Sequence, residues 1–296
     1  MFLYSIFWKI FSYIMFSFCN SIIKYLLGGS VFLVEVPLPI YIIIMYSYIF
    51  GVVLILPYFY LTKTFFMFKT KYFFLHFFRL IFFVSGFLLW GLSFKFMTLV
   101  QVAIISFGSY LLSIIVSVFF LKELITLKKF IALIVSILGV FITTCNMKIV
   151  NQDNVHFLVF FLPIFASFSF SLEKVISRKL LLLKEQSSLL TFYSLFFTAP
   201  FCLLPIFQYG WVNPEINHFF YFFILGILSI LSIYSHNKSY VYSEVTLLMP
   251  FFPFKLIISC IFGFFFFGEI PNFFDIFIWF FILVFCSFVL FYSEKK

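Results

Sequence analysis

The sequence predicts an all-α integral membrane protein whose ten transmembrane helices form two inverted five-helix repeats. Three observations lead to this fold class: the composition, a series of long apolar runs, and a polar signature that occurs twice. Of the 296 residues, 65% are hydrophobic and 10% are charged, and the mean hydropathy is +1.22. A soluble domain has about 25% charged residues. This chain has too little polar surface to face water, so we expect a lipid bilayer around it.

The long apolar runs define the predicted helices. A helix needs about 20 apolar residues to cross a hydrocarbon core of roughly 30 Å, and it must pair its backbone amides internally. The runs are continuous rather than alternating, which indicates helices and not barrel strands. The first run lacks a small-residue cleavage site, so we expect no signal peptide. The predicted helices are residues 4–27, 38–61, 72–94, 98–120, 127–147, 155–177, 189–208, 218–237, 243–267 and 272–292.

The positions of the basic residues predict the orientation. One set of junctions holds most of them, and the opposite junctions have only Lys95 and Lys148. Lys and Arg collect in cytoplasmic loops, so both termini should be cytoplasmic in a multi-pass protein of the cell inner membrane. The net charge of +9 follows from this topology, and we expect no nucleic-acid partner. The basic junction residues are Lys63, Lys69, Lys71, Lys122, Lys128, Lys129, Arg178, Lys179, Lys184, Lys238, Lys295 and Lys296.

The repeated polar signature lies near the end of each half. Val116–Ile142 and Cys260–Leu290 each contain an apolar helix, a Glu at its end, a short polar turn and a last apolar helix. The two acidic residues are Glu123 and Glu269. Five helices per half is an odd number, so the second copy must enter the membrane upside down, as in many secondary transporters. The predicted repeats are residues 1–148 and 155–293.

The same two segments resemble a known family. FFLKELITLKKFIALIVSILGVFI, which begins at Phe119, resembles the junction of helices four and five in EamA-type carriers of the drug/metabolite transporter superfamily. FFFFGEIP (Phe264–Pro271) resembles the same signature in the second half. Within that superfamily, His76–Gly86 and Ile105–Glu123 resemble S-adenosylmethionine uptake transporters of intracellular bacteria. The resemblance implies a secondary carrier with a small-molecule substrate and no cofactor.

Ionisable and aromatic side chains inside the predicted helices are the candidate substrate-binding residues. A charge in hydrocarbon costs roughly 2.5–3.5 kcal/mol on insertion scales, so it normally faces a cavity or a partner. Lys255 lies about half-way along the ninth predicted helix, and Arg79 lies within the third. Either could hold a carboxylate, although Arg79 could equally bind lipid headgroups. If the cargo is S-adenosylmethionine, Trp90, Tyr110 or Tyr193 could face its sulfonium by cation–π attraction.

Two prolines and the two signature acids have further predicted roles. Pro250 and Pro253 should kink the ninth helix and provide a gating hinge, because each removes a backbone hydrogen bond. Glu123 and Glu269 lie at helix ends, where we expect each to cap the N-terminus of the next helix. Proton coupling through these carboxylates is the alternative.

The remaining sequence features argue against other classes. The five Cys form no CxxC pair and the four His are dispersed, so we expect no metal site, no disulfide framework and no catalytic cluster. A phosphate-binding GxxxxGK[ST] motif is missing. We therefore predict that the chain is not an enzyme. An exporter of amino acids or other metabolites, a lipid-modifying membrane enzyme and a structural or assembly protein stay open, and a homodimer is compatible with the sequence.

Overall fold

The computed structural model describes most of the chain. The described residues are 2–28, 37–62, 70–105, 107–124, 161–248 and 251–269, with short pieces between 126 and 142 and between 273 and 285. Within these residues the regular structure is entirely helical. Five of the helices are long and apolar enough to cross a bilayer, judged by length and composition. The fold class is therefore all-α with several candidate membrane spans.

The helices follow the predicted apolar runs closely in the described parts. The predicted runs 127–147 and 272–292 lie largely outside the described residues. The helices are α1 (Phe2–Leu26), α2 (Ile40–Leu61), α3 (Phe73–Ser93), α4 (Leu99–Ile105), α5 (Phe107–Leu121), α7 (Phe161–Leu182), α8 (Ser187–Phe201), α9 (Leu203–Tyr209), α10 (Ile216–Tyr242), α11 (Val245–Leu248) and α12 (Phe252–Phe267).

One predicted run is interrupted within the described residues. α4 and α5 both lie in run 98–120, and α11 and α12 both lie in run 243–267, but residue 106 and residues 249–250 between them are outside the described residues. Run 189–208 becomes α8 and α9, which meet at Cys202 directly after Pro200. Pro205 of α9 has no amide hydrogen to donate to the carbonyl oxygen of Phe201, and its ring crowds that carbonyl, which explains the interruption at Cys202.

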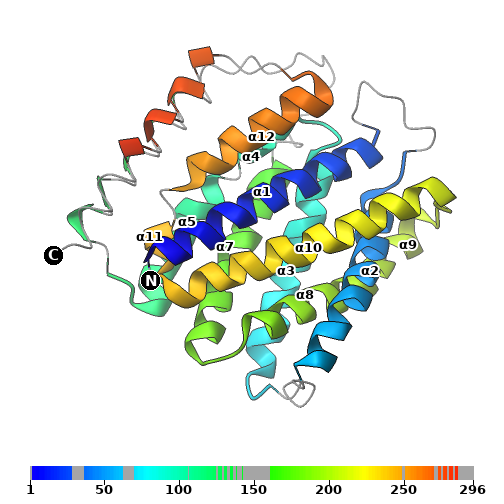
Figure 1. Cartoon of the computed structure of the whole chain (residues 1–296), viewed down its shortest axis with the longest axis horizontal. Coiled ribbons are helices and arrows are strands. Elements are labelled where there is room, and N and C mark those ends of the chain that lie inside the picture. The colour runs from blue at the N-terminus through cyan, green and yellow to red at the C-terminus, as the bar shows by residue number, and fades with distance from the viewer. Residues whose placement is uncertain are drawn as a thin grey trace.

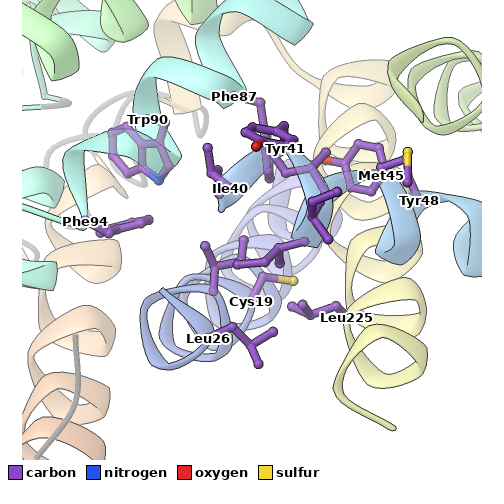
Figure 2. Close-up of a cluster of buried hydrophobic side chains, with 14 of the residues drawn as sticks. Cys19, Leu26, Ile40, Tyr41, Met45, Tyr48, Phe87, Trp90, Phe94 and Leu225 are labelled. Carbon is purple, nitrogen blue, oxygen red and sulfur yellow. The ribbon is translucent and has the colours of Figure 1, made fainter. Parts of the chain in front are cut away.

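The helices pack in long antiparallel pairs around a buried interior. α1 and α10 lie side by side over most of their length (Figure 1). The Ser12 hydroxyl donates to the Ser232 carbonyl oxygen at 3.0 Å, and the rings of Tyr25 and Tyr221 lie 5.4 Å apart near the other end. α3 packs along α7 in the same way, and α2 contacts α8 and α10. Figure 2 shows part of the apolar cluster between these helices, including Trp90.

One contact between α2 and α10 depends on two glycines. A Cβ atom at Gly226 would lie 3.0 Å from the backbone nitrogen of Gly51 and 3.1 Å from the carbonyl oxygen of Ser47. Small residues allow helix backbones to approach closely in membranes, where packing replaces the hydrophobic effect as the source of association. This close approach holds α10 against α2, so that the inner face of α10 can line the interior.

Candidate substrate cavity

A cavity of about 90 Å³ lies between six of the helices. Its lining combines aromatic rings with a few charged and polar groups, as small-molecule sites usually do. The lining residues are Ser12, Tyr13, Phe16 and Cys19 of α1, Tyr48 of α2, Phe83, Phe87 and Trp90 of α3, Phe170, Glu173 and Lys174 of α7, Ser229, Ser232, Ile233, His236 and Asn237 of α10, and Lys255 of α12.

Lys255 reaches this cavity from α12 and is surrounded by rings. Its Nζ atom lies 4.6 Å from the ring centroid of Trp90, 4.7 Å from that of Phe16 and 5.7 Å from that of Phe252. The residue is 4% exposed. Among the described residues it makes no hydrogen bond and no ion pair, so the faces of the rings provide its electrostatic stabilisation.

A second buried lysine lies at one end of the cavity. Lys9 of α1 is fully buried, and its Nζ atom donates to the Tyr240 hydroxyl at 2.9 Å. The same atom lies 3.2 Å from Nδ1 of His236, which also lines the cavity. The Tyr240 ring lies beneath the ammonium group, at 4.2 Å from its centroid. α1 and α10 are therefore joined by a charged hydrogen-bond cluster next to the cavity.

Arg79 lies behind the cavity wall rather than in it. It is fully buried, and its NH1 atom lies 3.7 Å from Oε1 of Glu173. The guanidinium also donates to the Ser194 hydroxyl at 3.0 Å and to the Leu190 carbonyl oxygen at 2.9 Å. Glu173 accepts a further hydrogen bond from Ser177 at 2.6 Å. Arg79 thus positions Glu173 at the cavity and ties α3 to α7 and α8.

The charges around the cavity are unbalanced. Glu173 is the one carboxylate among the described lining residues, while Lys174 and Lys255 both line the cavity. Lys9 and Arg79 add positive charge immediately behind. Buried charges are stable only when they are paired or otherwise solvated. The surplus of positive charge therefore makes the cavity favourable for a carboxylate or another anionic group.

Tyr48 offers a polar group to the same space. Its hydroxyl is buried and has no hydrogen-bond partner within the described parts of the chain. Buried hydroxyls normally find a partner, and those without one in a cavity are available to a ligand. Tyr48 lies two residues from Tyr46, whose ring stacks on Phe222 at 5.2 Å and so points elsewhere.

The structure separates the predicted substrate-binding residues. Lys255 and Trp90 line the cavity together, whereas Arg79 does not. Tyr193 packs against the ring of His76, with centroids 4.9 Å apart, and belongs to a separate apolar cluster. Tyr110 lies in α5, and its side chain is outside the described residues.

The predicted proline hinge has a different local setting. Pro250 lies outside the described residues, so its prediction is untested. Pro253 lies in the first turn of α12, directly after Phe252. Proline is tolerated in the first turn because the amide there has no intrahelical acceptor. Pro253 therefore costs α12 no backbone hydrogen bond, and its role as a hinge stays a prediction.

Several cavity residues were missed by the sequence reasoning. Lys9, His236 and Asn237 were given no role, yet all three lie at or beside the cavity. Lys9 stands inside the first apolar run, so the argument that selected Lys255 applied equally to it. His236 and Asn237 lie at the end of a predicted run, where polar residues are common, so no sequence signal marked them.

Glu269 joins three separate parts of the chain. It forms a buried ion pair with Lys24 of α1, and its Oε2 atom accepts a hydrogen bond from the backbone nitrogen of Leu99, the first residue of α4, at 3.3 Å. Gly268, with a φ of 64°, ends α12 in the left-handed conformation and turns the chain back. The carboxylate then lies over Gly263, where a Cβ atom would be 2.8 Å from Oε2.

Glu123 makes the corresponding contact at the start of α11. Its two carboxylate oxygens accept hydrogen bonds from the backbone nitrogens of Val245 and Thr246, at 3.1 and 3.0 Å. Lys122, the residue before it, has a φ of 56° and follows the end of α5 as Gly268 follows α12. Each signature Glu thus caps a helix start in the other predicted repeat. The sequence predicted a cap on the next helix along the chain, and residues 125 and 270–272, where such caps would form, lie outside the described residues.

The described residues contain no group of His, Cys, Asp and Glu side chains that could hold a metal ion. Cys19, Cys202 and Cys260 are buried thiols. Cys19 lines the cavity, and the other two do not. The chemistry around the cavity is therefore that of charge, hydrogen bonds and aromatic rings.

Three curated relatives match most of the chain. The relative from Rickettsia felis is 26% identical over 77% of this chain and 74% of its own length. Those from Rickettsia bellii and Rickettsia conorii are 27% and 26% identical over 69% of this chain, and over 68% and 67% of their own lengths. All three are named S-adenosylmethionine uptake transporter. The chain is similar to S-adenosylmethionine uptake transporters.

Two further comparisons complete this result. No protein-family model matches the chain. A solved crystal structure has the same fold, with a TM-score of 0.71 and 13% identity, over 97% of this chain and 95% of that one. The similarity to transporters and the apolar helices together support a multi-pass membrane transporter of a small molecule, and they argue against an enzyme.

Proposed function

We propose that the chain is a secondary transporter that takes up S-adenosylmethionine across the cell inner membrane by alternating access. Ten helices in two inverted repeats, residues 1–148 and 155–293, would form the carrier, with both termini in the cytoplasm. The single observation that carries the proposal is the cavity between the helices, which Lys255 and Glu173 face from different helices. We take S-adenosylmethionine as the proposed cargo because the relatives are named for its uptake.

The packing of the helices supports the inverted repeat. In chain order, α1, α2 and α3 of the first half correspond to α7, α8 and α10 of the second. The long pair α1–α10 then has its counterpart in α3–α7, and the contact of α1 with α12 corresponds to that of α7 with α5. Such reciprocal contacts are expected when two copies meet about a pseudo-two-fold axis in the membrane plane.

The signature acids support the same relation residue by residue. From Glu123 to Glu269 is 146 residues, and from Leu99 to Val245 is also 146 residues. Each acid follows a residue with positive φ, and each caps the helix start of the opposite half. A shared ancestral unit accounts for this match, since two unrelated segments would not have both the spacing and the contact in common.

The cavity suits the chemistry of the proposed cargo in part. S-adenosylmethionine has a carboxylate, two cationic groups and a flat adenine ring. The positive surplus favours the carboxylate, and the rings of Trp90, Phe16 and Phe87 favour the sulfonium and the adenine. Drug-sized ligands occupy pockets of about 300–1,000 Å³. The cavity of about 90 Å³ is smaller, so the helices around it would have to move apart before this cargo could enter.

Uptake of radiolabelled S-adenosylmethionine tests the proposal directly. Cells that express the protein should accumulate the label with saturable kinetics, and unlabelled S-adenosylmethionine should compete. Cells that carry the empty expression vector provide the control for leakage. Uptake that does not exceed this control would exclude S-adenosylmethionine as the cargo.

A second function, export of amino acids or related metabolites, has one observation in its favour. The positive surplus around the cavity suits any solute with a carboxylate, whether or not it has a sulfonium. Counterflow from preloaded proteoliposomes, with a panel of amino acids and nucleosides, distinguishes the two. Exchange with amino acids and none with S-adenosylmethionine would favour the exporter.

A further inference from the structure

The ammonium group of Lys255 occupies a three-sided aromatic cage. The cage consists of Phe16, Trp90 and Phe252, whose ring centroids lie 4.6–5.7 Å from Nζ. No carboxylate in the described residues lies within ion-pair distance of this atom. Two of the rings, Phe16 and Trp90, also line the cavity. A cation that enters the cavity would therefore meet the same ring faces.

The cage is rigidly built from three helices. The indole nitrogen of Trp90 donates to Oδ1 of Asn20 at 3.4 Å, which fixes the ring of α3 against α1. The rings of Phe16 and Trp90 have centroids 6.1 Å apart. Phe252, at the start of α12, is completely buried. The rings hold their positions through packing and this hydrogen bond, so the cage would persist if the ammonium group left it.

We propose that this cage is the binding site for an organic cation of the substrate, such as a sulfonium, and that Lys255 occupies it as a substitute until the substrate arrives. The inference rests on the proposed function and specifies its substrate class: a solute that combines an organic cation with a carboxylate. When the substrate cation enters the cage, the Lys255 ammonium moves into the cavity and pairs with the carboxylate.

The relative hydration of the two cations favours this exchange. An ammonium is a compact and strongly hydrated charge, so burial against rings costs it much of its solvation. Cation–π stabilisation favours weakly hydrated cations, and aromatic cages are a general means of recognising quaternary ammonium ligands. A sulfonium has its charge spread over alkyl groups and loses little hydration on entry. The flexible four-carbon stem of Lys255 allows the ammonium to withdraw.

The exchange explains how a positively charged cavity could accept a cation. A solute with only a cation would leave the displaced ammonium of Lys255 with Glu173 as the one carboxylate among the described lining residues, and that carboxylate already faces Arg79. A solute with only a carboxylate would find that ammonium still held by the rings. A solute with both groups fills the cage and also neutralises the displaced ammonium. The Lys255 side chain alone would therefore make the cavity prefer solutes that have both a cation and a carboxylate.

Binding of three probes in lipid nanodiscs tests the exchange. The probes are S-adenosylmethionine, S-adenosylhomocysteine, which lacks the sulfonium charge, and trimethylsulfonium, which lacks the carboxylate. Isothermal titration calorimetry gives each Kd. In Lys255→Met an uncharged, flexible side chain replaces the ammonium group among the rings and no cation competes for them, so trimethylsulfonium should bind at least about tenfold more tightly than to the wild type. Lys95→Met, the same change at an exposed position after α3, should behave as the wild type.

A second variant tests the proposal even if Lys255→Met does not fold. In Phe16→Leu the cage loses one ring, and the preference for S-adenosylmethionine over S-adenosylhomocysteine should fall by about tenfold or more. The proposal is overturned if trimethylsulfonium binds Lys255→Met no more tightly than the wild type, or if Phe16→Leu keeps the full preference.

The outcome is distinguishable from that of the proposed function. Saturable uptake of S-adenosylmethionine with no effect of the cage variants on charge preference would support the transporter and reject the exchange. Tighter trimethylsulfonium binding to Lys255→Met without S-adenosylmethionine uptake would support the cage and indicate another cargo with the same pair of charges.

Discussion

Four buried cations lie in or behind the cavity wall, and the side chains around them differ. Lys9 rests on a hydroxyl, an imidazole and a ring, and Arg79 has a carboxylate, a hydroxyl and a carbonyl oxygen. Lys174 faces the cavity beside Glu173, and Lys255 has three rings. A cation that is held by hydrogen bonds is fixed in place and stabilises the packing of the helices. A charge held by ring faces alone can change partner at little cost, so Lys255 is the one most suited to contact a moving solute.

Replacing Lys255 by Met should abolish transport without preventing insertion. The apolar side chain suits a membrane helix and fits among the same rings, so the fold should survive. The variant cannot pair with a carboxylate in the cavity. We expect substrate uptake to fall to the level of empty cells while the amount of protein in the membrane stays within about twofold of the wild type. Normal uptake by this variant would remove Lys255 from the site.

Replacing Arg79 by Met should act on stability first. The change leaves the Glu173 carboxylate without its cation at a buried position, and breaking a buried pair costs about 3–5 kcal/mol. We expect a marked fall in the unfolding temperature in detergent, and a partial recovery in Arg79→Met combined with Glu173→Gln. Equal unfolding temperatures for the single variant, the double variant and the wild type would show that the pair is not stabilising.

At the scale of helices, two helix starts depend on carboxylates from distant parts of the chain. α4 begins where the Glu269 carboxylate accepts a backbone hydrogen bond, and α11 begins where Glu123 accepts two. The Glu269 end also has the ion pair with Lys24, which ties α1 to the same point. Under the proposed topology the Glu123 contact lies on the cytoplasmic side and the Glu269 contact on the opposite side. One contact would then have to open each time the cavity opens to that side.

Glutamine substitutions should separate these two contacts. Glu123→Gln keeps an oxygen that can accept one of the two backbone hydrogen bonds, so we expect a loss of about 1 kcal/mol, as for a weakened helix cap. Glu269→Gln leaves the Lys24 ammonium buried without its carboxylate, and we expect a loss of about 3 kcal/mol. Chemical unfolding in mild detergent measures both. A larger loss in Glu123→Gln than in Glu269→Gln would contradict this difference.

The positions of several helices could be predicted from the sequence, but the contacts that form the site could not. The starts of α2, α3 and α10 lie within two residues of the predicted runs, because a span needs a certain apolar length and little else. The contact of Lys24 with Glu269 joins residues 245 positions apart, and no local pattern reports such a pair. The ring cage was equally hidden, because with 56 Phe residues the sequence could not indicate which ones surround Lys255.

At the scale of the whole molecule, neither half should be complete without the other. α1 packs on α10, α3 packs on α7, and each half caps a helix of its partner. We expect residues 1–150 and 151–296 to be degraded when each is expressed alone. Expressed together in one cell, they should restore substrate uptake to a measurable fraction of the intact chain. Stable accumulation of either half alone would show that its own contacts are sufficient.

The Glu269 contact also has a consequence for synthesis. Leu99 and Glu269 are 170 residues apart, and chains grow at about 5–20 residues per second. The start of α4 must therefore remain in the membrane without this carboxylate for roughly 10–35 s after it is made, and the Lys24 ammonium, 245 residues from Glu269, for roughly 10–50 s. During that interval lipid headgroups, water or an insertion chaperone must shield them. Variants that slow translation near the end of the gene should lower the yield of folded protein more than those that slow it near the start.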